Sequence, residues 1–302
     1  MLNVQDVRKT FFAGTVNERV ALNGVSLTVN PGDFVTVIGS NGAGKSTLLN
    51  TVSGTIIPDS GRIMVGDRDV TRLPEHRKAT WISRVFQDPM KGSSPTLSIE
   101  QNMAIAQRRG RSRGLARGVT RARRHEFEQE LKTLELGLEH RLGAKVGLLS
   151  GGQRQALSLL MATFSAPEIL LLDEHTAALD PQRAQHVTEI TERIVNERHL
   201  TTLMVTHNMD QALRLGNRLI MMHEGRILFE LDAQQKAEAT VADLLAEFRK
   251  LQAATGEPAL DDATLLETAR SAEPAGAPSR GAPAHGAPTG GSSAPGVSPE
   301  GH

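Results

Sequence analysis

The nine residues "GSNGAGKST", Gly39 to Thr47, indicate what kind of fold this chain adopts. They match the spacing G-x-x-x-x-G-K-[ST], follow the apolar run "FVTVI" (Phe34–Ile38) and lead into the helix-forming run "STLLNTVSG" (Ser46–Gly54). In such a unit, glycines let backbone N–H groups turn inward around a phosphate, and the start of the helix adds positive potential. The stretch predicts a phosphate-binding P-loop rather than an ordinary glycine-rich turn, because a chance match has odds on the order of one in a hundred.

Each position of this loop has an expected contact with a nucleotide. Lys45 would reach the β- and γ-phosphates, and the hydroxyl group of Ser46 would ligate Mg²⁺. The residues predicted to bind the nucleotide here are Gly39, Ser40, Asn41, Gly42, Ala43, Gly44, Lys45, Ser46 and Thr47.

Two carboxylates end the apolar run "ILLLDE" (Ile169–Glu174). Asp173 and Glu174 are expected at the C-terminal end of a buried strand, where open α/β sheets bind their ligands. Asp173 suits a metal-side contact, usually through water, and Glu174 could polarise an attacking water molecule. The alternative is a carboxylate pair that is simply exposed at a strand end, which the P-loop disfavours.

Strand-like and helix-like runs alternate along the chain, and the strands are aliphatic, as in a sheet covered on both faces. The predicted fold class is α/β: a P-loop NTPase core with a mainly parallel sheet, an N-terminal antiparallel β subdomain and an α-helical subdomain at about residues 89–160. Ser98 and Gln101 have the spacing of a capping box, and a second helix is expected from Thr120. The run "ATWISRVFQ" (Ala79–Gln87) is expected to be a strand, with Trp81 packing in the core.

The composition excludes several classes of protein. The 302 residues carry 34 Lys+Arg and 34 Asp+Glu, so the net charge of zero gives no global attraction to nucleic acid or to an acidic membrane surface. The absence of cysteine excludes disulfides, thiolate metal sites and a cysteine nucleophile. No apolar run approaches the ~18 residues that span a bilayer, and the N-terminus lacks the pattern of a secretory signal. We expect a cytoplasmic protein whose membrane role depends on a partner.

The composition shifts near the C-terminus. Residues 1–251 form the predicted main domain, which ends in an amphipathic helix "TVADLLAEFRKLQ" (Thr240–Gln252). Residues 252–271 are expected to be a linker or short helix. Residues 272–302 are nearly all Ala, Pro, Gly and Ser, and we expect them to be disordered. A partner-binding role is the alternative for this tail.

A second glycine-containing stretch, "LSGGQRQ" (Leu149–Gln155), also suits an anion. Ser150, Gly151 and Gly152 open a predicted helix whose free N–H groups favour a phosphate. No lysine stands beside them. The chain therefore carries two partial phosphate-binding sites, and their separation needs an explanation.

The motifs together resemble those of the ATPase subunits of ATP-binding cassette (ABC) transporters, over about Leu2 to Leu251. "GSNGAGKST" is similar to the Walker A motif, "VFQDP" to the Q-loop and "LSGGQ" to the family signature. "ILLLDE" is similar to the Walker B motif, "AALD" to the D-loop and "VTH" to the H-loop. A signature together with both Walker motifs is very specific, whereas each short piece alone is weak.

The resemblance implies an ATPase that uses ATP and Mg²⁺ and works as a head-to-tail dimer with a second copy of itself. Each nucleotide would lie between the P-loop of one copy and the signature of the other, so neither copy alone would close a site. The residues implied to reach the nucleotide across this interface are Ser150, Gly151, Gly152, Gln153 and Asp180.

The resemblance also implies roles for Gln87 and His207. Gln87 would contact Mg²⁺ and the water and would sense the transport partner; its alternative is a polar residue at a strand end. His207 would contact the γ-phosphate and hold the geometry of Glu174; its alternative is a cap or surface residue. The implied catalytic residues are Glu174, His207 and Gln87, and the implied metal-side residues are Ser46, Gln87 and Asp173.

Adenine would stack on Phe11, or alternatively on Phe12, unless these rings only pack in the core. Two other positions depart from the family pattern. His175 stands where proline commonly follows the Walker B glutamate, and Ala156 stands where arginine commonly follows the signature glutamines. Both are expected beside the site rather than in it, so they concern the subfamily more than ATP hydrolysis.

The resemblance implies an importer arrangement, in which this subunit sits on the inner face of the cell membrane through separate permease subunits. A solute-binding protein would be an indirect partner. The wording around the motifs is similar to that of bacterial uptake ATPases for amino-acid-like solutes, with tryptophan and tyrosine as candidates, although cargo is set by the permease and binding protein. The alternatives are an exporter, or an ABC-type ATPase that acts on nucleic acid or ribosomes. A single P-loop and no sustained heptads disfavour the latter, so no nucleic-acid partner is expected.

Arginine is concentrated in "QRRGRSRGLARGVTRARR" (Gln107–Arg124). The plain interpretation is a solvated or lipid-facing surface. The sharper alternatives are contact with anionic lipid headgroups or with permease loops, and nucleic acid is the third.

Overall fold

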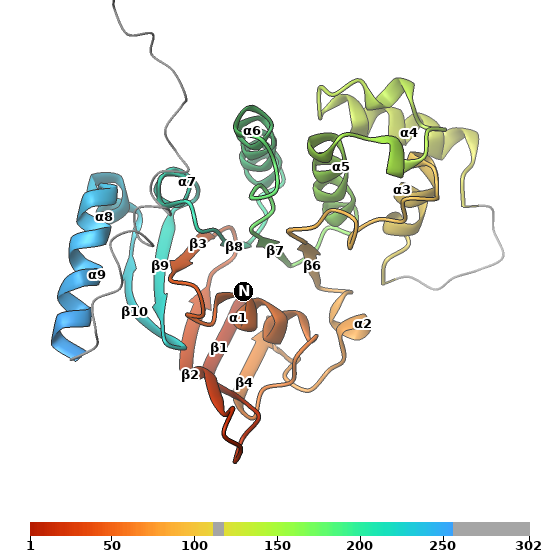
Figure 1. Ribbon diagram of the computed structural model, residues 1–302. Coiled ribbons are helices and arrows are strands. Elements are labelled where there is room, and N and C mark those ends of the chain that lie inside the picture. Colours follow the sequence, from red (N-terminus) through yellow and green to blue (C-terminus); the bar gives the residue numbers. More distant parts are fainter. Residues whose placement is uncertain (111–117, 256–302) are drawn as a thin grey trace, which may run out of the picture. The chain divides into compact units, whose positions relative to one another are not determined.

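The computed structural model describes residues 1–110 and 118–255 of the chain, and these belong to one unit that spans residues 1–272 (Figure 1). The predictions for the Ala/Pro/Gly/Ser-rich tail, and for most of the linker before it, lie outside the described residues. The strands are β1 (Leu2–Phe11), β2 (Arg19–Val29), β3 (Phe34–Gly39), β4 (Ser60–Val65), β5 (Arg68–Asp69), β6 (Ile82–Val85), β7 (Ile169–Asp173), β8 (Thr202–Val205), β9 (Arg218–His223) and β10 (Arg226–Leu231). The α-helices are α1 (Lys45–Ser53), α2 (Glu75–Lys78), α3 (Ile99–Gln107), α4 (Arg121–Lys132), α5 (Gly151–Thr163), α6 (Pro181–Glu197), α7 (Met209–Arg214), α8 (Ala233–Glu238) and α9 (Val241–Thr255).

The central sheet has six strands in the order β10-β9-β3-β8-β7-β6. All neighbours are parallel except the β9–β10 hairpin, which confirms the predicted mainly parallel sheet. Strand β3 lies between β8 and β9, so Val37 pairs with Val205 on one side and with Ile220 on the other. The P-loop that follows β3 therefore leaves the middle of the sheet.

Alternate residues of the central strands pack into different cores. In β7, Leu170 and Leu172 belong to the core that contains α3, α4, α5 and α6. Ile169 and Leu171 point the other way, into a core shared with α1 and the N-terminal strands. Because successive side chains of a strand point to opposite faces, a continuous aliphatic run is the pattern that a sheet covered on both faces requires.

The N-terminal residues form the predicted antiparallel sheet, in the order β2-β1-β4-β5. Its apolar side packs on α1, and Figure 1 shows α1 next to β1 and β4. The sheet thus supports the P-loop helix from below in that view. Strands β1 and β2 pair with Phe11 opposite Arg19, which places both side chains at the same end of the hairpin.

Most predicted helix starts are confirmed. Helix α3 begins with a complete capping box of Ser98 and Gln101, and Thr120 caps α4. The predicted strand over Ala79–Gln87 was too long, because β6 covers only Ile82–Val85. Residues 79–81 instead continue from α2, because their N–H groups donate to carbonyl oxygens of that helix. The sequence analysis did not predict helices α2 and α8.

Trp81 packs against the core as expected, and the guanidinium group of Arg68 lies 5.3 Å from the centre of its ring.

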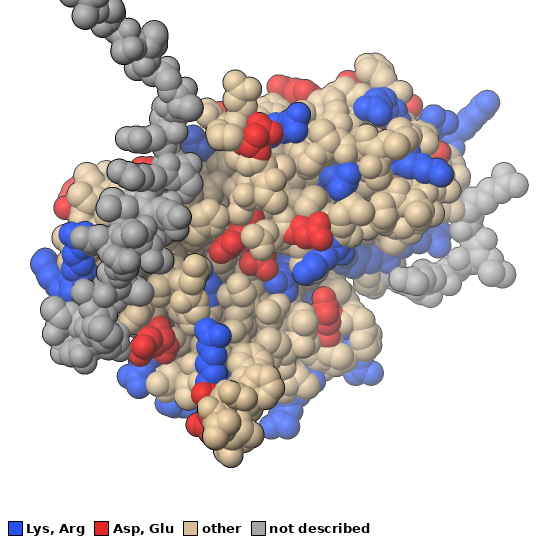
Figure 2. All heavy atoms as spheres, viewed as in Figure 1, with Lys and Arg blue, Asp and Glu red and all other residues tan. Residues whose placement is uncertain are grey.

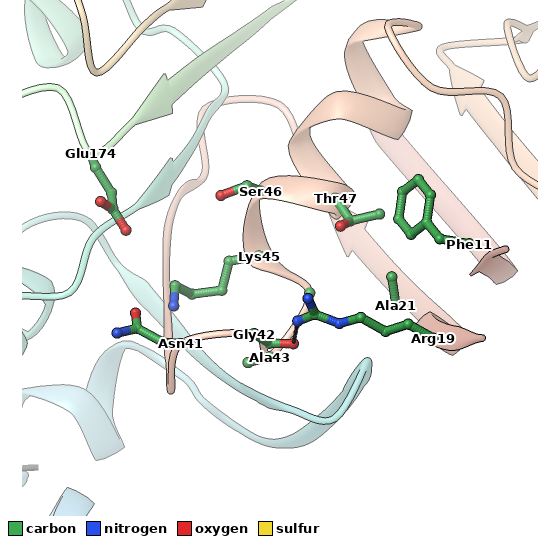
Figure 3. Close-up of a pocket in the computed structure, with 11 residues that line it drawn as sticks. Phe11, Arg19, Ala21, Asn41, Gly42, Ala43, Lys45, Ser46, Thr47 and Glu174 are labelled. Atoms are coloured by element: carbon green, nitrogen blue, oxygen red, sulfur yellow. Dashed lines mark hydrogen bonds between the residues drawn. The ribbon is translucent and has the colours of Figure 1, made fainter. Parts of the chain in front are cut away.

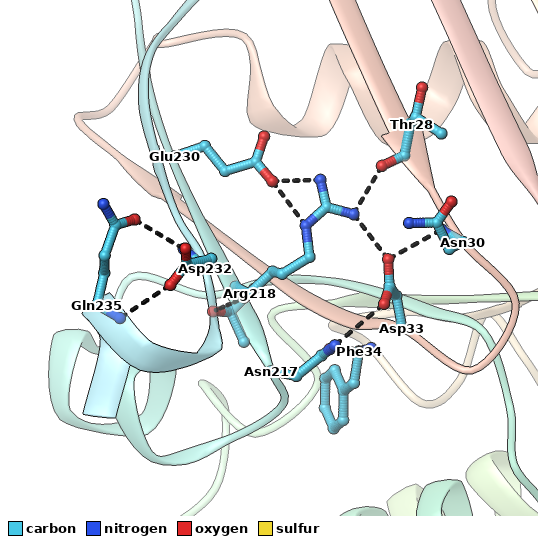
Figure 4. Close-up of polar contacts among 10 residues, drawn as sticks. Thr28, Asn30, Asp33, Phe34, Asn217, Arg218, Glu230, Asp232 and Gln235 are labelled. Carbon is cyan, nitrogen blue, oxygen red and sulfur yellow. Dashed lines mark hydrogen bonds and ion pairs between the residues drawn. The ribbon is translucent and has the colours of Figure 1, made fainter. Parts of the chain in front are cut away.

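An ion-pair cluster lies at the start of β3 and β9, at the opposite end of these strands from the P-loop (Figure 4). Arg218 in β9 donates to Asp33 Oδ2 at 2.7 Å and to the carbonyl oxygen of Thr28 at 2.8 Å, and it also pairs with Glu230 in β10. Asn217 donates to the other carboxylate oxygen of Asp33 at 3.0 Å. Burial acts to raise the pKa of Asp33, but the hydrogen bonds and Arg218 hold it below its ordinary value. The cluster ties the β2–β3 turn to the last two strands.

Basic side chains are prominent over the α3–α4 region in Figure 2. The arginine-rich stretch is described only at its two ends, residues 107–110 and 118–124. There, Arg109 is half-buried and donates to Ser83 Oγ at 2.8 Å, whereas Arg121 and Arg124 are exposed at the start of α4. None of the helices within the described ranges is long and apolar enough to cross a membrane.

Candidate nucleotide-binding and catalytic site

The P-loop is packed tightly between two other segments. Gly39 has a φ of 151°, and a side chain there would collide with the carbonyl oxygen of Met222. Gly44 caps α1 with a φ of 99°, in the left-handed region that favours glycine. The turn between β9 and β10 supports the loop from outside, because Gly225 N–H donates to the carbonyl oxygen of Ala43 at 3.0 Å.

His223, at the end of β9, makes a further contact with the loop. Its Nδ1 lies 3.3 Å from Ser40 Oγ. The ring also packs against Phe248 of α9 in a T-shaped arrangement, with 5.3 Å between the ring centres. The C-terminal helix therefore supports the P-loop through this histidine.

Lys45 is the buried cation of the site. Its side chain amine donates to the carbonyl oxygens of Gly39 and Ser40, at 2.7 and 3.0 Å. Burial lowers the pKa of Lys45, while the carboxylates of Glu174 and Asp173 act to raise it. The ammonium group is thus held over the loop, on the side where the two carboxylates lie.

The P-loop opens into a pocket of about 230 Å³. Figure 3 shows Glu174 and Lys45 on one side of it, and Phe11, Arg19 and Ala21 on the other. Phe11 lines this pocket, whereas Phe12 is 70% exposed and has a φ of 54°. Of the two aromatic candidates, Phe11 is therefore the one that faces the P-loop pocket.

Arg19 was missed by the reasoning from sequence. Its guanidinium group lines the same pocket and donates to the carbonyl oxygen of Gly42 at 3.3 Å (Figure 3). Only the pairing of Arg19 with Phe11 in the β1–β2 hairpin brings it there. Predicting the register of this hairpin from the sequence would have placed Arg19 next to Phe11 and so beside the pocket.

The three residues predicted beside Mg²⁺ meet in a neighbouring pocket. Ser46, Gln87 and Asp173 line this pocket of about 420 Å³. A hydroxyl, an amide and a carboxylate supply the oxygen ligands that Mg²⁺ prefers. Within the described residues, no group of three or more His, Cys, Asp or Glu side chains could hold a metal, so such an ion would also depend on phosphate oxygens and water.

Arg84 in β6 is a second functional neighbour that sequence reasoning missed. It donates to Asp173 Oδ2 at 2.5 Å and to Asn50 Oδ1 at 2.6 Å, and its side chain is only 10% exposed. One carboxylate oxygen of Asp173 is therefore occupied by the guanidinium group of Arg84. This arrangement favours contact between Asp173 and Mg²⁺ through a water molecule over direct ligation by both carboxylate oxygens.

Glu174 follows β7 with a φ of 42°, a strained conformation for a residue with a side chain. Its N–H donates to the carbonyl oxygen of Val205 at 2.9 Å. Its Oε2 accepts from Gln87 Nε2 at 3.4 Å and lies 3.6 Å from His207 Nδ1. The contact with His207 lowers the pKa of Glu174, against the effect of burial, and Lys45 adds to the lowering. The carboxylate is therefore ionised at neutral pH.

The signature forms the start of α5, as predicted. Ser150 Oγ accepts from Gln153 N–H at 3.3 Å, and Gln153 Oε1 accepts from Ser150 N–H at 3.2 Å. Asp180 caps α6 through a single hydrogen bond of this kind, with Arg183 N–H donating to its Oδ1 at 3.2 Å. Neither of the two pockets around the P-loop is lined by residues of the signature.

The two departures from the family pattern lie in the core. His175 is 1% exposed, and its Nε2 lies 2.9 Å from Thr191 Oγ1. Ala156 is fully buried in α5. His175 follows Glu174 and Ala156 follows the signature, but neither side chain lines the two pockets.

Comparison with known proteins agrees with this geometry. The family model described as ABC transporter matches residues 22–177. The chain belongs to the ABC transporter family. It is an ATP-binding ATPase of that family, with the α/β fold of an ABC cassette.

Individual relatives cover most of this ABC cassette. It is 41% identical over 248 residues to the tyrosine transport ATP-binding protein of Clostridioides difficile (strain R20291), which covers 82% of this chain and 98% of that relative. It is 36% identical over 245 residues to the Fe(3+) ions import ATP-binding protein FbpC of Agrobacterium fabrum (strain C58 / ATCC 33970), covering 81% of this chain and 64% of that relative.

A solved structure shows a similar cassette as a dimer. It is described as the dimeric structure of a post-hydrolysis state of the ATP-binding cassette MJ0796, bound to ADP and Pi. The match has a TM-score of 0.64 and 28% identity, and it covers 77% of this chain and 99% of that one.

Proposed function

We propose that this chain is the ATP-hydrolysing subunit of an ABC importer. Two copies would bind and hydrolyse ATP with Mg²⁺ and drive an amino-acid-like solute through separate permease subunits. The proposal of ATP hydrolysis rests on the surroundings of Glu174. Its carboxylate contacts Gln87 and His207 and is influenced by the buried amine of Lys45 in the P-loop.

The nucleotide would occupy the pocket of the P-loop. Phe11 stacks on adenine, and Lys45 leaves the carbonyl oxygens of its own loop to meet the β- and γ-phosphates. Backbone N–H groups at the start of α1 favour the same charge. The residues proposed to bind ATP in this copy are Gly39, Ser40, Asn41, Gly42, Ala43, Gly44, Lys45, Ser46, Thr47 and Phe11.

Ser46, Gln87 and Asp173 would hold Mg²⁺, Asp173 through water. When bound, this ion neutralises part of the charge on the phosphate oxygens.

Glu174 would act on the attacking water. Its ionised carboxylate orients the water and accepts a proton as the water oxygen bonds to the γ-phosphorus. The bond from that phosphorus to the β–γ bridging oxygen breaks, which leaves ADP and phosphate. His207, 3.6 Å from the Glu174 carboxylate, holds that carboxylate in position and contacts the γ-phosphate. Gln87 donates to the same carboxylate from the side where Mg²⁺ would bind.

The site would be completed by a second copy. The signature residues line neither P-loop pocket of their own chain, and the similar cassette MJ0796 is a dimer. Ser150, Gly151, Gly152 and Gln153 of one copy would face the γ-phosphate on the other, with Asp180 beside them. Lysine is not needed in the signature because the opposite copy provides Lys45.

The permease would be sensed next to Gln87. A cavity of about 470 Å³ begins at Lys91, four positions further along, and lies between residues 91–95 and helix α3. Ile105 on its wall is 57% exposed, so an apolar side chain is available to a partner. A permease loop in this cavity would press on the segment that carries Gln87. The cassette would then be held on the inner face of the membrane.

The amino-acid class of cargo is supported by the relative named for tyrosine transport, which is matched over nearly its whole length. The relative named for Fe(3+) import has a similar cassette, so the cassette alone leaves the solute open. A solute-binding protein would deliver the cargo to the permease.

The change Glu174→Gln tests the catalytic part. The amide cannot accept the proton, so we expect ATP hydrolysis to fall at least about 100-fold while ATP binding is kept. The variant should form a stable dimer with ATP, measured by size-exclusion chromatography with light scattering. Glu197→Gln, at the exposed end of α6, is the control and should hydrolyse ATP normally. Normal turnover by Glu174→Gln would remove this residue from the mechanism.

Uptake of labelled tyrosine and tryptophan tests the cargo separately. Cells that carry only Glu174→Gln should lose this uptake, and the Glu197→Gln strain should retain it. Unchanged uptake in both strains would contradict an amino-acid cargo while leaving the ATPase intact.

A further inference from the structure

A buried group of polar side chains lies behind Glu174 and His207. It consists of the amide of Gln211 in α7 and the hydroxyl groups of Thr176, Thr188 and Thr206, and we name it the Gln211 cluster. The three threonines are at most 9% exposed. Polar groups at this depth need hydrogen-bond partners, and in this cluster the side chains supply them to one another.

The hydrogen bonds fix which way the amide points. Thr188 Oγ1 donates to the carbonyl oxygen of Ala184 at 2.7 Å, so it can only accept from Gln211 Nε2, which is 2.8 Å away. Thr206 Oγ1 accepts from Asn208 N–H at 3.1 Å and donates to Gln211 Oε1 at 2.8 Å. Gln211 Nε2 also reaches Thr176 Oγ1 at 3.3 Å. Both ends of one amide are therefore used, with a single consistent orientation.

Each hydroxyl group belongs to a segment that carries a residue of the site. Thr206 directly precedes His207, and Thr176 lies two positions after Glu174. Thr188 is in α6, whose first residues follow Asp180. The amide of Gln211 is thus the point at which the H-loop, the end of the Walker B motif and the D-loop helix are joined.

We propose that Gln211 is a positioning residue that keeps His207 at the distance from Glu174 that hydrolysis requires. The inference rests on the proposed roles of these two residues. Their side chains are 3.6 Å apart, and Glu174 also has the strained φ of 42°. A pair held loosely at this distance would lose its geometry with small movements of the loop that carries His207. Gln211 lines neither P-loop pocket, so it acts through His207, and we expect its loss to lower turnover much more than the affinity for ATP.

The substitution Gln211→Met tests this inference. Methionine has nearly the same length and volume, so packing is retained while all three side-chain hydrogen bonds of the amide are lost. We expect kcat for ATP hydrolysis to fall about 10-fold or more, with KM and the affinity for ATP within twofold of the unchanged protein. Gln185→Met is the control, because Gln185 is exposed on α6, and it should leave both constants unchanged.

A second variant guards against a folding defect. Thr206→Val removes one partner of the same amide and keeps the shape of the side chain. It should lower kcat with the same sparing of KM, and adding it to Gln211→Met should cost less than the product of the two single effects. Circular dichroism and thermal unfolding establish that the variants are folded.

The outcomes separate this inference from the proposed function. Wild-type kcat in folded Gln211→Met, or a rise in KM that accounts for the loss, would overturn the role of Gln211. If Glu174→Gln is inactive at the same time, the proposed function stands and only this inference fails. If Glu174→Gln hydrolyses ATP normally, the proposed function fails first.

Discussion

Glu174 and His175 are adjacent in the chain but have opposite surroundings. Glu174 faces the P-loop pocket and keeps its charge, while His175 points into the core beneath α6. Thr191 Oγ1 donates to the carbonyl oxygen of Val187 at 2.7 Å, so His175 Nε2 must carry a proton and donate to Thr191. His175 Nδ1 has no hydrogen-bond partner among the described residues. A second proton on this ring would create a buried charge without a partner.

This histidine predicts a pH dependence of stability. Burial lowers the pKa of His175 to about 4, whereas an unfolded histidine titrates near 6.5. Between these values the unfolded chain binds more protons than the folded one, so the free energy of unfolding decreases as the pH falls from 7 to 5. The expected loss from this group is about 2 kcal/mol. Urea unfolding of the wild type and of His175→Gln at both pH values measures it.

The neutral glutamine should remove most of that pH dependence, because it cannot be protonated. His125→Gln is the matched control, since His125 is exposed on α4, and it should unfold like the wild type at both pH values. Equal pH dependence in wild type and His175→Gln would show that the buried ring is not the cause.

At the scale of elements, buried lysines close the C-terminal ends of two helices. Lys78 is fully buried, and its amine donates to the carbonyl oxygens of Thr51 and Val52 in the last turn of α1, at 3.0 and 3.2 Å. Lys236 of α8 does the same after α7, through the carbonyl oxygens of Leu215 and Gly216. The last carbonyl groups of a helix lack hydrogen-bond donors within the helix and carry partial negative charge. Each lysine supplies these carbonyl groups with a donor and with a positive charge.

Removing the amine of Lys78 should loosen the P-loop helix at its far end. Lys78→Met keeps the length of the side chain but leaves the two carbonyl oxygens without their donor, and we expect a loss of about 1–3 kcal/mol in the free energy of unfolding. Lys132→Met is the control, because Lys132 is exposed in the last turn of α4. It should change stability by less than about 0.5 kcal/mol. Chemical denaturation of both variants decides, and equal stability would exclude a capping role.

Helix starts and motif positions were predictable because their signals are local. Ser98 and Gln101 are three residues apart, and the Walker and signature motifs are continuous stretches. The missed contacts are not local: Arg84 meets Asp173 across 89 positions, and Gln211 meets Thr188 across 23. Side-chain pairs of this kind depend on sheet order and helix placement, which no short pattern contains.

At the scale of the molecule, the two halves of the proposed site lie on different parts of the chain. The P-loop leaves the centre of the sheet, while the signature begins a helix that packs with α3, α4 and α6 on one face of it. Figure 1 shows α5 and α1 on opposite sides of strand β6. This separation supports the proposal that a second copy closes the site.

The change Ser150→Arg should block that closure. A long cation at the start of α5 would fill the space proposed for the partner's γ-phosphate. We expect ATP binding to the monomer to be unchanged, but no ATP-dependent dimer in a Glu174→Gln background, measured by light scattering. Ser98→Arg is a matched control, because it disrupts the capping box of α3 in the same way. Dimers in both variants would argue against a shared site.

The contact between His223 and Ser40 has a consequence for synthesis of the chain. The two residues are 183 positions apart, and strand β3 likewise needs β8 and β9 as neighbours. At about 5–20 residues per second, translation delivers the supporting turn roughly 10–40 s after the glycine-rich loop. During this interval a nascent chain carries the loop without the support of this turn. The contacts that support the loop in the folded protein become available only after the last two strands of the described sheet have been synthesised.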